Sequence, residues 1–265
     1  TNQISWTCQR GISVSSGTKV LISNNYIHDI ALMEGCGTNP SGLFISTGVT
    51  QSLITDNIIE RIGYDGIFAG GIGNVYQRNQ VHYVLLILND GGPIYIPGSA
   101  NHNLLFSHNV VSDGFGNLDG TPSNGVGSGH TVCLYNDDYS WNNTLFENTA
   151  YNCRFGIQIH NAQTIICKSN VLYNNTYAIL LQKNVPCLST DQSMCHIDGC
   201  VIEDNVMVGF SKNGLLLCGN TDWRNYSTYS GNLYCNLGQD TVSSFYQYAP
   251  SFERWKKEMV PNARQ

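Results

Sequence analysis

The sequence predicts an all-β chain that folds as a single right-handed parallel β-helix, with a short capping helix at the C-terminus. Two short sequence phrases recur along the 265 residues, and copies of the first are spaced as closely as 22 residues. Repeats of about 20–29 residues are typical of solenoids, in which each coil buries its apolar face only by stacking on its neighbours. The alternative is an up-and-down β-barrel or a β-propeller, but propeller repeats are longer, at about 40–45 residues.

The first phrase consists of an apolar residue, two variable residues, Asn, one variable residue and usually a further apolar residue. Its first copies are Ile22-Ser23-Asn24-Asn25-Tyr26-Ile27 and Ile54-Thr55-Asp56-Asn57-Ile58-Ile59. The same Asn recurs at Asn79, Asn109, Asn148, Asn170, Asn205 and Asn232. We expect these amides to stack at equivalent turns and to hydrogen-bond in a ladder along the axis. Their predicted role is therefore structural.

The second phrase places Gly or another small residue before an apolar-x-apolar strand, as in Gly42-Leu43-Phe44-Ile45. Alternation with a period of two residues indicates strands with one buried face. Gly and Asn between the strands supply turns that need a positive φ. We expect one parallel ladder of inward-facing side chains at Ile12, Leu43, Ile67, Ile94, Leu134, Ile157, Ile179 and Leu215.

The β-helix is expected to span residues 1–249, followed by a capping segment at 250–265. In that segment Phe252, Trp255 and Met259 would share one face of a helix that Ser251 caps. No similar segment precedes the first coil, so we expect either a fragment of a longer chain or a first coil covered by a neighbouring molecule. End-to-end self-association is one such arrangement.

The composition excludes several classes of partner. Charged residues make up 12% of the chain, the formal net charge is -6, and no basic cluster is present. Nucleic acid is therefore not an expected partner. The longest apolar run, Val84 to Leu88, is far shorter than the ~20 residues that a membrane-spanning helix needs.

The ten cysteines indicate an oxidising compartment, because none of them has the Cys-x-x-Cys spacing of a zinc or redox centre. We predict a secreted or cell-surface protein in which most of them are oxidised. One local bridge is expected among Cys187, Cys195 and Cys200. Links between neighbouring coils are expected for two further pairs, Cys8 with Cys36 and Cys218 with Cys235. The alternative is a set of buried free thiols.

Three N-glycosylation sequons lie at predicted turns. They begin at Asn142, Asn174 and Asn225. If the protein is secreted by a eukaryotic cell, we expect a glycan on at least one of them.

Acidic residues are scarce but cluster near one stack of strands. Asp90 precedes one strand, Asp137 and Asp138 follow the strand of the next coil, and His160 stands one coil further at the position equivalent to Asp137. Two carboxyl groups on one surface are what glycoside cleavage needs, since one protonates the leaving oxygen while the other attacks or activates water. His160 and Tyr95 are the candidate substrate contacts. We also expect the segment from Gly114 to His130 to form a wall of this site.

Two other interpretations use the same residues. Asp90-Gly91-Gly92 and Asp137-Asp138 are compatible with tight turns, as is Asp65, which we assign to a turn. Alternatively, carboxylates could bind Ca²⁺ between coils, namely Asp90, Asp113, Asp137 and Asp138. No EF-hand or nonapeptide calcium repeat is present, so we expect neither a metal nor a cofactor.

At these residues the chain resembles the β-helical glycoside hydrolases of the α-L-fucosidase and xylanase type. The segments that carry the resemblance are Leu88 to Gly92, Tyr135 to Asp138, Gly156 to His160 and the Phe252-x-x-Trp255 ending. The resemblance implies that Asp90 acts with Asp137 or Asp138 as the catalytic pair, and that His160 lies at the substrate. Two positions depart from the pattern, because Pro93 replaces a small residue and Asn136 an apolar one.

The sequence therefore predicts an extracellular β-helix that processes a polysaccharide or glycan as a glycoside hydrolase. The alternative is a non-catalytic β-helix that stacks end to end in a fibre, a sheath or a surface assembly.

Overall fold

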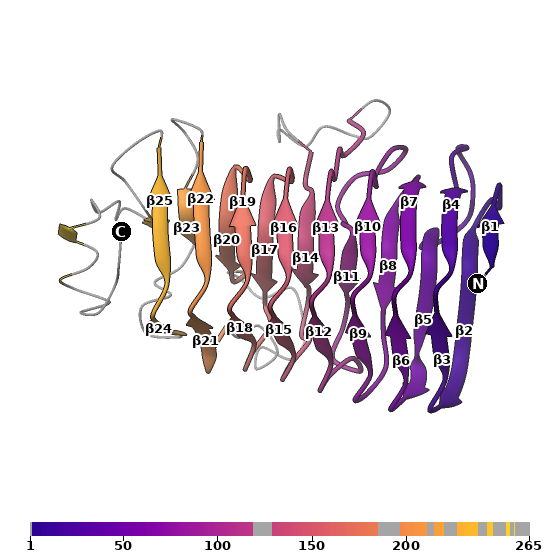
Figure 1. Ribbon diagram of the computed structural model, residues 1–265, viewed down its shortest axis with the longest axis horizontal. Coiled ribbons are helices and arrows are strands. Elements are labelled where there is room, and N and C mark those ends of the chain that lie inside the picture. Colours follow the sequence, from indigo (N-terminus) through magenta and orange to yellow (C-terminus); the bar gives the residue numbers. More distant parts are fainter. Residues whose placement is uncertain are drawn as a thin grey trace.

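The chain winds repeatedly through three parallel sheets, and its coils stack along one long axis (Figure 1). The computed structural model describes residues 2–118, 129–184, 197–210, 215–219, 227–237 and 243–245, together with 253, 254 and 257. Successive strands occupy the three sheets in turn, and every pairing between them is parallel. The predicted parallel β-helix is thus confirmed. In the described part of the chain no helix is long and apolar enough to cross a membrane.

Each sheet contains one strand from each coil. Sheet A contains β1 (Gln3–Ser5), β4 (Tyr26–Ile30), β7 (Ile58–Ile62), β10 (Gln80–His82), β13 (Val110–Ser112), β16 (Thr149–Tyr151), β19 (Val171–Tyr173), β22 (Val206–Gly209) and β25 (Leu233–Asn236). Sheet B contains β2 (Arg10–Thr18), β5 (Ser41–Thr50), β8 (Asp65–Ala69), β11 (Ile94–Ile96), β14 (Val132–Asn136), β17 (Phe155–His160), β20 (Tyr177–Gln182), β23 (Leu215–Gly219) and β26 (Ser243–Phe245). Sheet C contains β3 (Leu21–Ser23), β6 (Leu53–Thr55), β9 (Val75–Gln77), β12 (Leu105–Ser107), β15 (Thr144–Phe146), β18 (Ile166–Lys168), β21 (Cys200–Glu203) and β24 (Ser227–Ser230).

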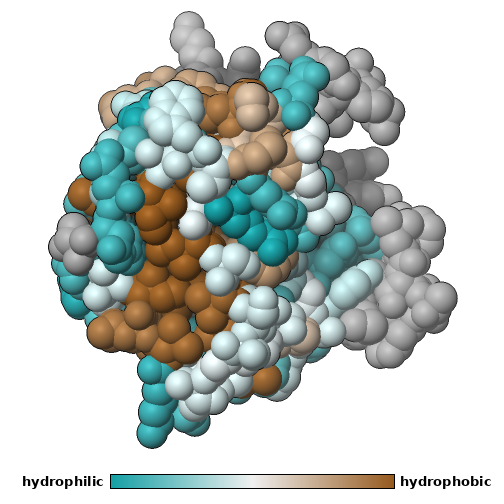
Figure 2. Space-filling view, turned by 90° about the vertical axis from the view of Figure 1, so that its right-hand side faces the viewer, coloured by the Kyte–Doolittle hydropathy of each residue, from teal (hydrophilic) through white to brown (hydrophobic). Residues whose placement is uncertain are grey.

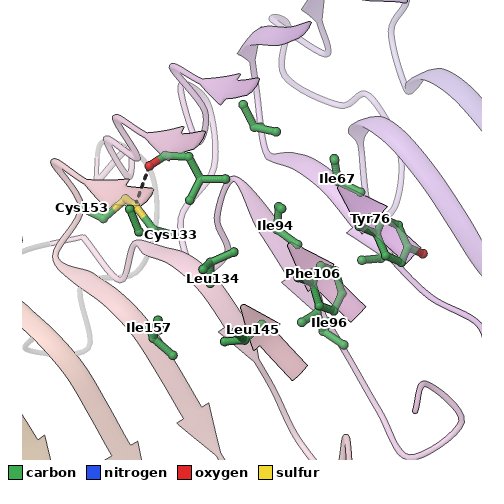
Figure 3. Packing of buried hydrophobic residues seen from close by; sticks show 14 of the residues in the cluster. Ile67, Tyr76, Ile94, Ile96, Phe106, Cys133, Leu134, Leu145, Cys153 and Ile157 are labelled. Carbon is green, nitrogen blue, oxygen red and sulfur yellow. Dashed lines mark hydrogen bonds between the residues drawn. A yellow bond between two sulfur atoms is a disulfide. The ribbon is translucent and has the colours of Figure 1, made fainter. Parts of the chain in front are cut away.

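The second sequence phrase forms an inward row of sheet B. The pairing runs in register from Ile12 to Ile179, and Figure 3 shows Ile67, Ile94, Leu134 and Ile157 from this row in the core. The last predicted member is wrong by two residues, because Ile179 pairs with Leu217, whereas Leu215 pairs with Tyr177. Three consecutive leucines, 215 to 217, leave no alternation from which the register could be predicted.

The first phrase forms the expected asparagine ladder between sheets C and A. The side-chain oxygen of Asn57 accepts hydrogen bonds from both the backbone N–H and the side-chain amide of Asn25, at 3.1 and 2.9 Å. The Asn57 amide in turn donates to Ile22 O and to the oxygen of Asn79. The pattern repeats as far as Asn232. The ladder residues themselves do not have a positive φ. The residue before each one does, as at Asn24 with 55°, so the ladder satisfies the backbone of a left-handed turn.

Two disulfides join neighbouring coils. The predicted link between Cys8 and Cys36 is present. A second link, which was not predicted, joins Cys133 in β14 to Cys153 before β17 (Figure 3).

Three further cysteines are free thiols, namely Cys167, Cys200 and Cys235. The predicted pair of Cys218 with Cys235 is therefore wrong, because these residues lie in different sheets, B and A. Cys187 and Cys195 lie outside the described residues, and Cys200 contributes to no bridge.

The N-terminal end of the coil stack is described, whereas most of the predicted cap at the other end is not. Figure 2 views the molecule from the end where the N-terminus lies and shows an apolar patch there. Ile4, Ile12 and Val14, which pack against the core, are only partly buried. At the other end the predicted capping helix largely falls outside the described residues, including Phe252, Trp255 and Met259. The backbone at 253, 254 and 257 is helical.

Candidate active site

The candidate site lies on the outer face of sheet B, where apolar and aromatic side chains form a second cluster apart from the core. Its buried members are Val132, Tyr135, Phe155 and Leu180, and Tyr95 and Tyr177 pack against them. The strand register places Tyr95, Tyr135, Gln158 and Leu180 in one outward-facing row. This row is the surface beside which the predicted polar residues lie.

Asp137 and His160 meet at the ends of β14 and β17, as the sequence predicts. Asn136 pairs with Ile159, so the two following residues are stacked one coil apart. The Nδ1 atom of His160 lies 2.7 Å from Asp137 Oδ1, and its Nε2 atom lies 3.0 Å from Asn184 Oδ1. Both ring nitrogens thus face oxygen acceptors, an arrangement that favours the imidazolium form. The Tyr95 hydroxyl donates to the other oxygen of Asp137 at 2.8 Å.

This network keeps Asp137 ionised although the carboxylate is largely buried. Burial by itself would raise the pKa of Asp137, but hydrogen bonds from His160, the Asp138 backbone N–H and Tyr95 outweigh it and lower the pKa. Burial would likewise lower the pKa of His160, but the hydrogen bonds to Asp137 and Asn184 raise it. The two side chains are 14% and 12% exposed, so their ion pair is only weakly screened by water.

Asp138 is the more exposed of the two adjacent carboxylates. It accepts a hydrogen bond from the Asn161 amide at 2.7 Å, and its Oδ1 atom lies 3.6 Å from Nδ1 of His160. It therefore stands at the rim of the network, whereas Asp137 lies inside it.

Asp90 sits in a tight turn before β11 and has a φ of 65°. Its backbone N–H donates to His130 O at 3.0 Å, and its own carbonyl accepts from the Tyr64 hydroxyl at 2.7 Å. The turn needs glycine after it, because a Cβ on Gly92 would lie 1.7 Å from the carbonyl oxygen of Val132 in the next coil. Asp and Asn adopt this left-handed conformation more readily than most other residues, and many other turns of this chain have it too, so the conformation of Asp90 is part of the turn.

Asp65, which the sequence assigns to a turn, lies beneath this segment as the first residue of β8. It is fully buried and accepts a hydrogen bond from the Gly92 backbone N–H at 3.0 Å. Burial raises the pKa of Asp65 well above its ordinary value. Asp65 therefore supports the turn that presents Asp90.

Asp90 differs from Asp137 in its electrostatic environment. Its side chain is 71% exposed to water, yet the surrounding protein desolvates the charge and raises its pKa, and the nearby Asp137 and Asp138 act in the same direction. His130 and His160 oppose the shift but do not reverse it. The Nε2 atom of His130 lies 3.9 Å from Asp90 Oδ1, and burial lowers the pKa of this imidazole. The predicted carboxyl groups thus lie close enough to influence one another's pKa values. Asp90 tends to hold its proton, whereas Asp137 tends to lose it.

Two residues near the site, Tyr64 and Asn184, were not predicted. His130 was predicted only as the end of the wall segment, and Tyr135 only as part of a segment that carries the resemblance. His130 ends the longest gap in the repeat, where no periodicity assigns a position to a side chain. Tyr135 could have been found, since alternation along β14 places it on the same outer face as Tyr95. Residues 119–128 of the predicted wall lie outside the described residues, but His130 borders Asp90, and Gly129 lies against Asn89.

The hydrogen bonds around Asp137 and Asp138 bear on the predicted substrate contacts and on the Ca²⁺ alternative. Tyr95 and His160 both hydrogen-bond Asp137, which makes them supports of that carboxylate. Single ligand atoms of Asp137, Asp138 and His160 lie within 4.8 Å of one another. Their oxygens already accept hydrogen bonds from Tyr95, His160 and Asn161, whereas Ca²⁺ takes six to eight oxygen ligands. Asp113, another carboxylate of the Ca²⁺ alternative, instead contacts Ser112 and Asn152 at the end of β13.

Two of the three sequons can be located. Asn142 and Asn174 are exposed at turns with a positive φ, as predicted, and their side-chain amides donate to Asn103 and Asn152. Asn225 lies outside the described residues.

Comparisons with known proteins agree with the fold. The family model described as a right-handed β-helix region matches residues 1–121 and 41–232. Similar solved structures include the complex of XylC with xylose, with a TM-score of 0.57 and 13% identity, covering 84% of this chain and 38% of that one. Another is the A-module of the mannuronan C-5 epimerase AlgE6 from Azotobacter vinelandii, with a TM-score of 0.54 and 17% identity, covering 93% and 64%.

The chain therefore spans between about a third and two thirds of the length of these two structures. At these identities the likeness is one of fold. A search of curated proteins gives no match. Because the family model matches most of the sequence, the chain belongs to the right-handed β-helix family.

Proposed function

We propose that the outer face of sheet B is the active site of an extracellular glycoside hydrolase that acts on a polysaccharide. In this proposal Asp90 is the general acid that protonates the leaving oxygen, and Asp137 is the nucleophile or the base that activates water. Asp138 is the alternative to Asp137. Tyr95 and His160 position Asp137 and keep it ionised.

The observation that carries the proposal is the pairing of two carboxyl groups in opposite environments on one face. Asp137 is held by His160 and Tyr95 at 2.7 and 2.8 Å, whereas Asp90 has no cationic partner closer than His130 at 3.9 Å among the described ion pairs. Carboxyl groups whose pKa values are pushed apart are the mark of an acid and base pair. A separation of about 5–10 Å between their oxygens would suit either stereochemical outcome.

The substrate class follows from the fold and the face together. XylC, which shares the fold, was solved with xylose, and AlgE6 is named for an epimerase of mannuronan. Both names support a glycan as the substrate. The resemblance at Asp90 and Asp137 supports fucosylated or xylan-type polysaccharides as the first candidates. Two disulfides support an extracellular location.

The test is release of reducing sugar from xylan, fucosylated polysaccharide and alginate by the full chain and by single variants. We expect Asp90→Asn and Asp137→Asn each to lower kcat by about 100-fold or more, because one proton transfer is lost. Asp204→Asn, which changes an exposed carboxylate at the corner between sheets C and A, is the control and should retain most activity. Activity unchanged in Asp90→Asn would refute the assignment.

End-to-end assembly is a second candidate function, favoured by the apolar patch at the N-terminal end (Figure 2). A second copy would continue the three sheets and cover the partly buried Ile4, Ile12 and Val14. Sedimentation should then show species larger than the monomer, and Ile12→Asp should convert these species to monomers. A monomer at all concentrations would exclude this assembly.

A further inference from the structure

A second concave site lies beside the candidate active site, at the corner where the chain turns from sheet A into sheet B. It is a pocket of about 650 Å³, a size within the range of ~300–1,000 Å³ that is usual for small-molecule sites. Its described lining comes from three successive coils and consists of Asp113, Gly114, Phe115, Gly129, Thr131, Asn152, Cys153, Arg154, Asn174, Thr176 and Tyr177.

The pocket continues the active site along the helix axis. Asp90 occupies the same corner one coil earlier, and its backbone N–H reaches His130 O, between the lining residues Gly129 and Thr131. Successive coils rise by ~4.8 Å, so the pocket begins one coil beyond Asp90. An aromatic bridge makes the same connection, because the His130 ring lies 5.2 Å from Phe155, which stacks on Tyr177 at 5.1 Å.

The polar part of the lining is a row of side chains at equivalent turns. Asp113, Asn152 and Asn174 all have a positive φ, of 57°, 58° and 51°, and therefore project alike from three stacked coils. Asn152 donates to Asp113 at 2.9 Å, and Asn174 donates to Asn152 at 2.7 Å. Each amide keeps a second N–H, and the row presents further acceptor positions, so it can bind a hydroxyl-rich ligand.

The remaining lining suits a sugar as well. The hydroxyls of Thr131 and Thr176 and the guanidinium of Arg154 add donors, while Tyr177 contributes an aromatic side chain. The charges of Asp113 and Arg154 balance within the described lining, so it offers no net positive charge that would attract an anionic sugar such as a uronate. Amides, hydroxyls and one aromatic ring together are a common set for sugar recognition, because they pair hydroxyl groups and cover apolar ring faces.

We propose that this pocket binds neutral sugar residues of a polysaccharide, next to the residue held at Asp90 and Asp137. The pocket and the active site then form one binding surface that runs along the β-helix axis. The placement of the neighbouring sugar rests on the proposed function, but sugar binding in the pocket does not. Glycans long enough to cover both sites should bind through the pocket, whereas disaccharides held at the active site should not.

The experiment uses the full chain on an array of neutral and uronate glycans of two to eight residues, followed by calorimetry on the tightest neutral glycan and its disaccharide. Asn152→Ala and Arg154→Ala each remove one polar partner in the pocket. We expect each to weaken binding of the long glycan by about tenfold and to leave the disaccharide unchanged. Arg78→Ala, an exposed arginine at the corner between sheets C and A, is the matched control and should bind as the parent does.

The possible outcomes separate this proposal from the proposed function. If the parent and both pocket variants bind the long glycan equally, the pocket proposal is overturned, whether or not the chain hydrolyses it. If binding depends on the pocket but no polysaccharide is cleaved, the pocket proposal stands and the hydrolase assignment fails. Uronate glycans binding as tightly as neutral ones would overturn the neutral-sugar class, and an array with no bound glycan would overturn the pocket altogether.

Discussion

The ion pair of Asp137 with His160 is the residue-level feature that decides the protonation state of the site. Asp137→Asn removes the negative charge that stabilises the imidazolium, so we expect the pKa of His160 to fall from its raised value. NMR titration of the histidine ring protons measures this directly. Asp138→Asn, which changes the neighbouring carboxylate, should shift the pKa of His160 less. An unchanged titration of His160 in Asp137→Asn would mean that the pair does not form.

The same pair predicts a pH window for stability. The raised pKa of His160 stabilises the fold fully below 6.5, and this contribution is lost as pH rises through the raised value. The lowered pKa of Asp137 stabilises the fold above 3.8, and this contribution is lost as pH falls through the lowered value. Asp137→Asn should therefore reduce the free energy of unfolding most between these limits, by about 3 kcal/mol. Urea unfolding at pH 5 and pH 9 measures the difference, and an equal loss at both would contradict the account.

At the scale of a single structural element, the asparagine ladder is the clearest source of stability. Asn109→Ala would leave the backbone N–H and the side-chain amide of Asn79 and the carbonyl of Tyr76 without the partner that Asn109 provides, and the oxygen of Asn148 would keep only the backbone N–H of residue 109. All of these groups are buried, so we expect a loss of about 3 kcal/mol or more. Asn2→Ala removes only the single bond to Asn25 at the open end of the ladder and is the control. Equal unfolding midpoints for both variants would rule out this role.

The turn before β11 links an element to the site. A methyl group on Gly92 would collide with the backbone of Val132, so Gly92→Ala must displace the turn that carries Asp90. We expect a loss of ~2 kcal/mol in stability together with a loss of activity. Ser99→Ala, a small change at an exposed residue in the turn that follows β11, is the control. A fully active Gly92→Ala would show that the position of Asp90 does not matter.

At the scale of the whole molecule, the fold could be predicted because every coil of a solenoid repeats the same sequence pattern. Each ladder Asn and each Gly-apolar phrase is further evidence for the same kind of coil. One ambiguous copy, such as the leucines at 215–217, therefore shifts the predicted register of one strand without changing the predicted architecture. Asp137 and His160 could be placed together for the same reason, since each follows a residue of one strand pair, Asn136 and Ile159. The positions of His130 and of the disulfide between Cys133 and Cys153 could not be predicted in this way. They depend on how the longer loops return to the coil, and those loops follow no repeat.

The central claim is that Asp90 and Asp137 are opposite members of one acid and base pair, and the pH profile of kcat/KM on the cleaved polysaccharide tests it most directly. Activity requires ionised Asp137 and protonated Asp90, so it should fall at low pH through the lowered pKa of Asp137 and at higher pH through the raised pKa of Asp90. We predict a bell-shaped profile whose alkaline limb disappears in the residual activity of Asp90→Asn. An alkaline limb that persists unchanged in that variant would contradict the claim.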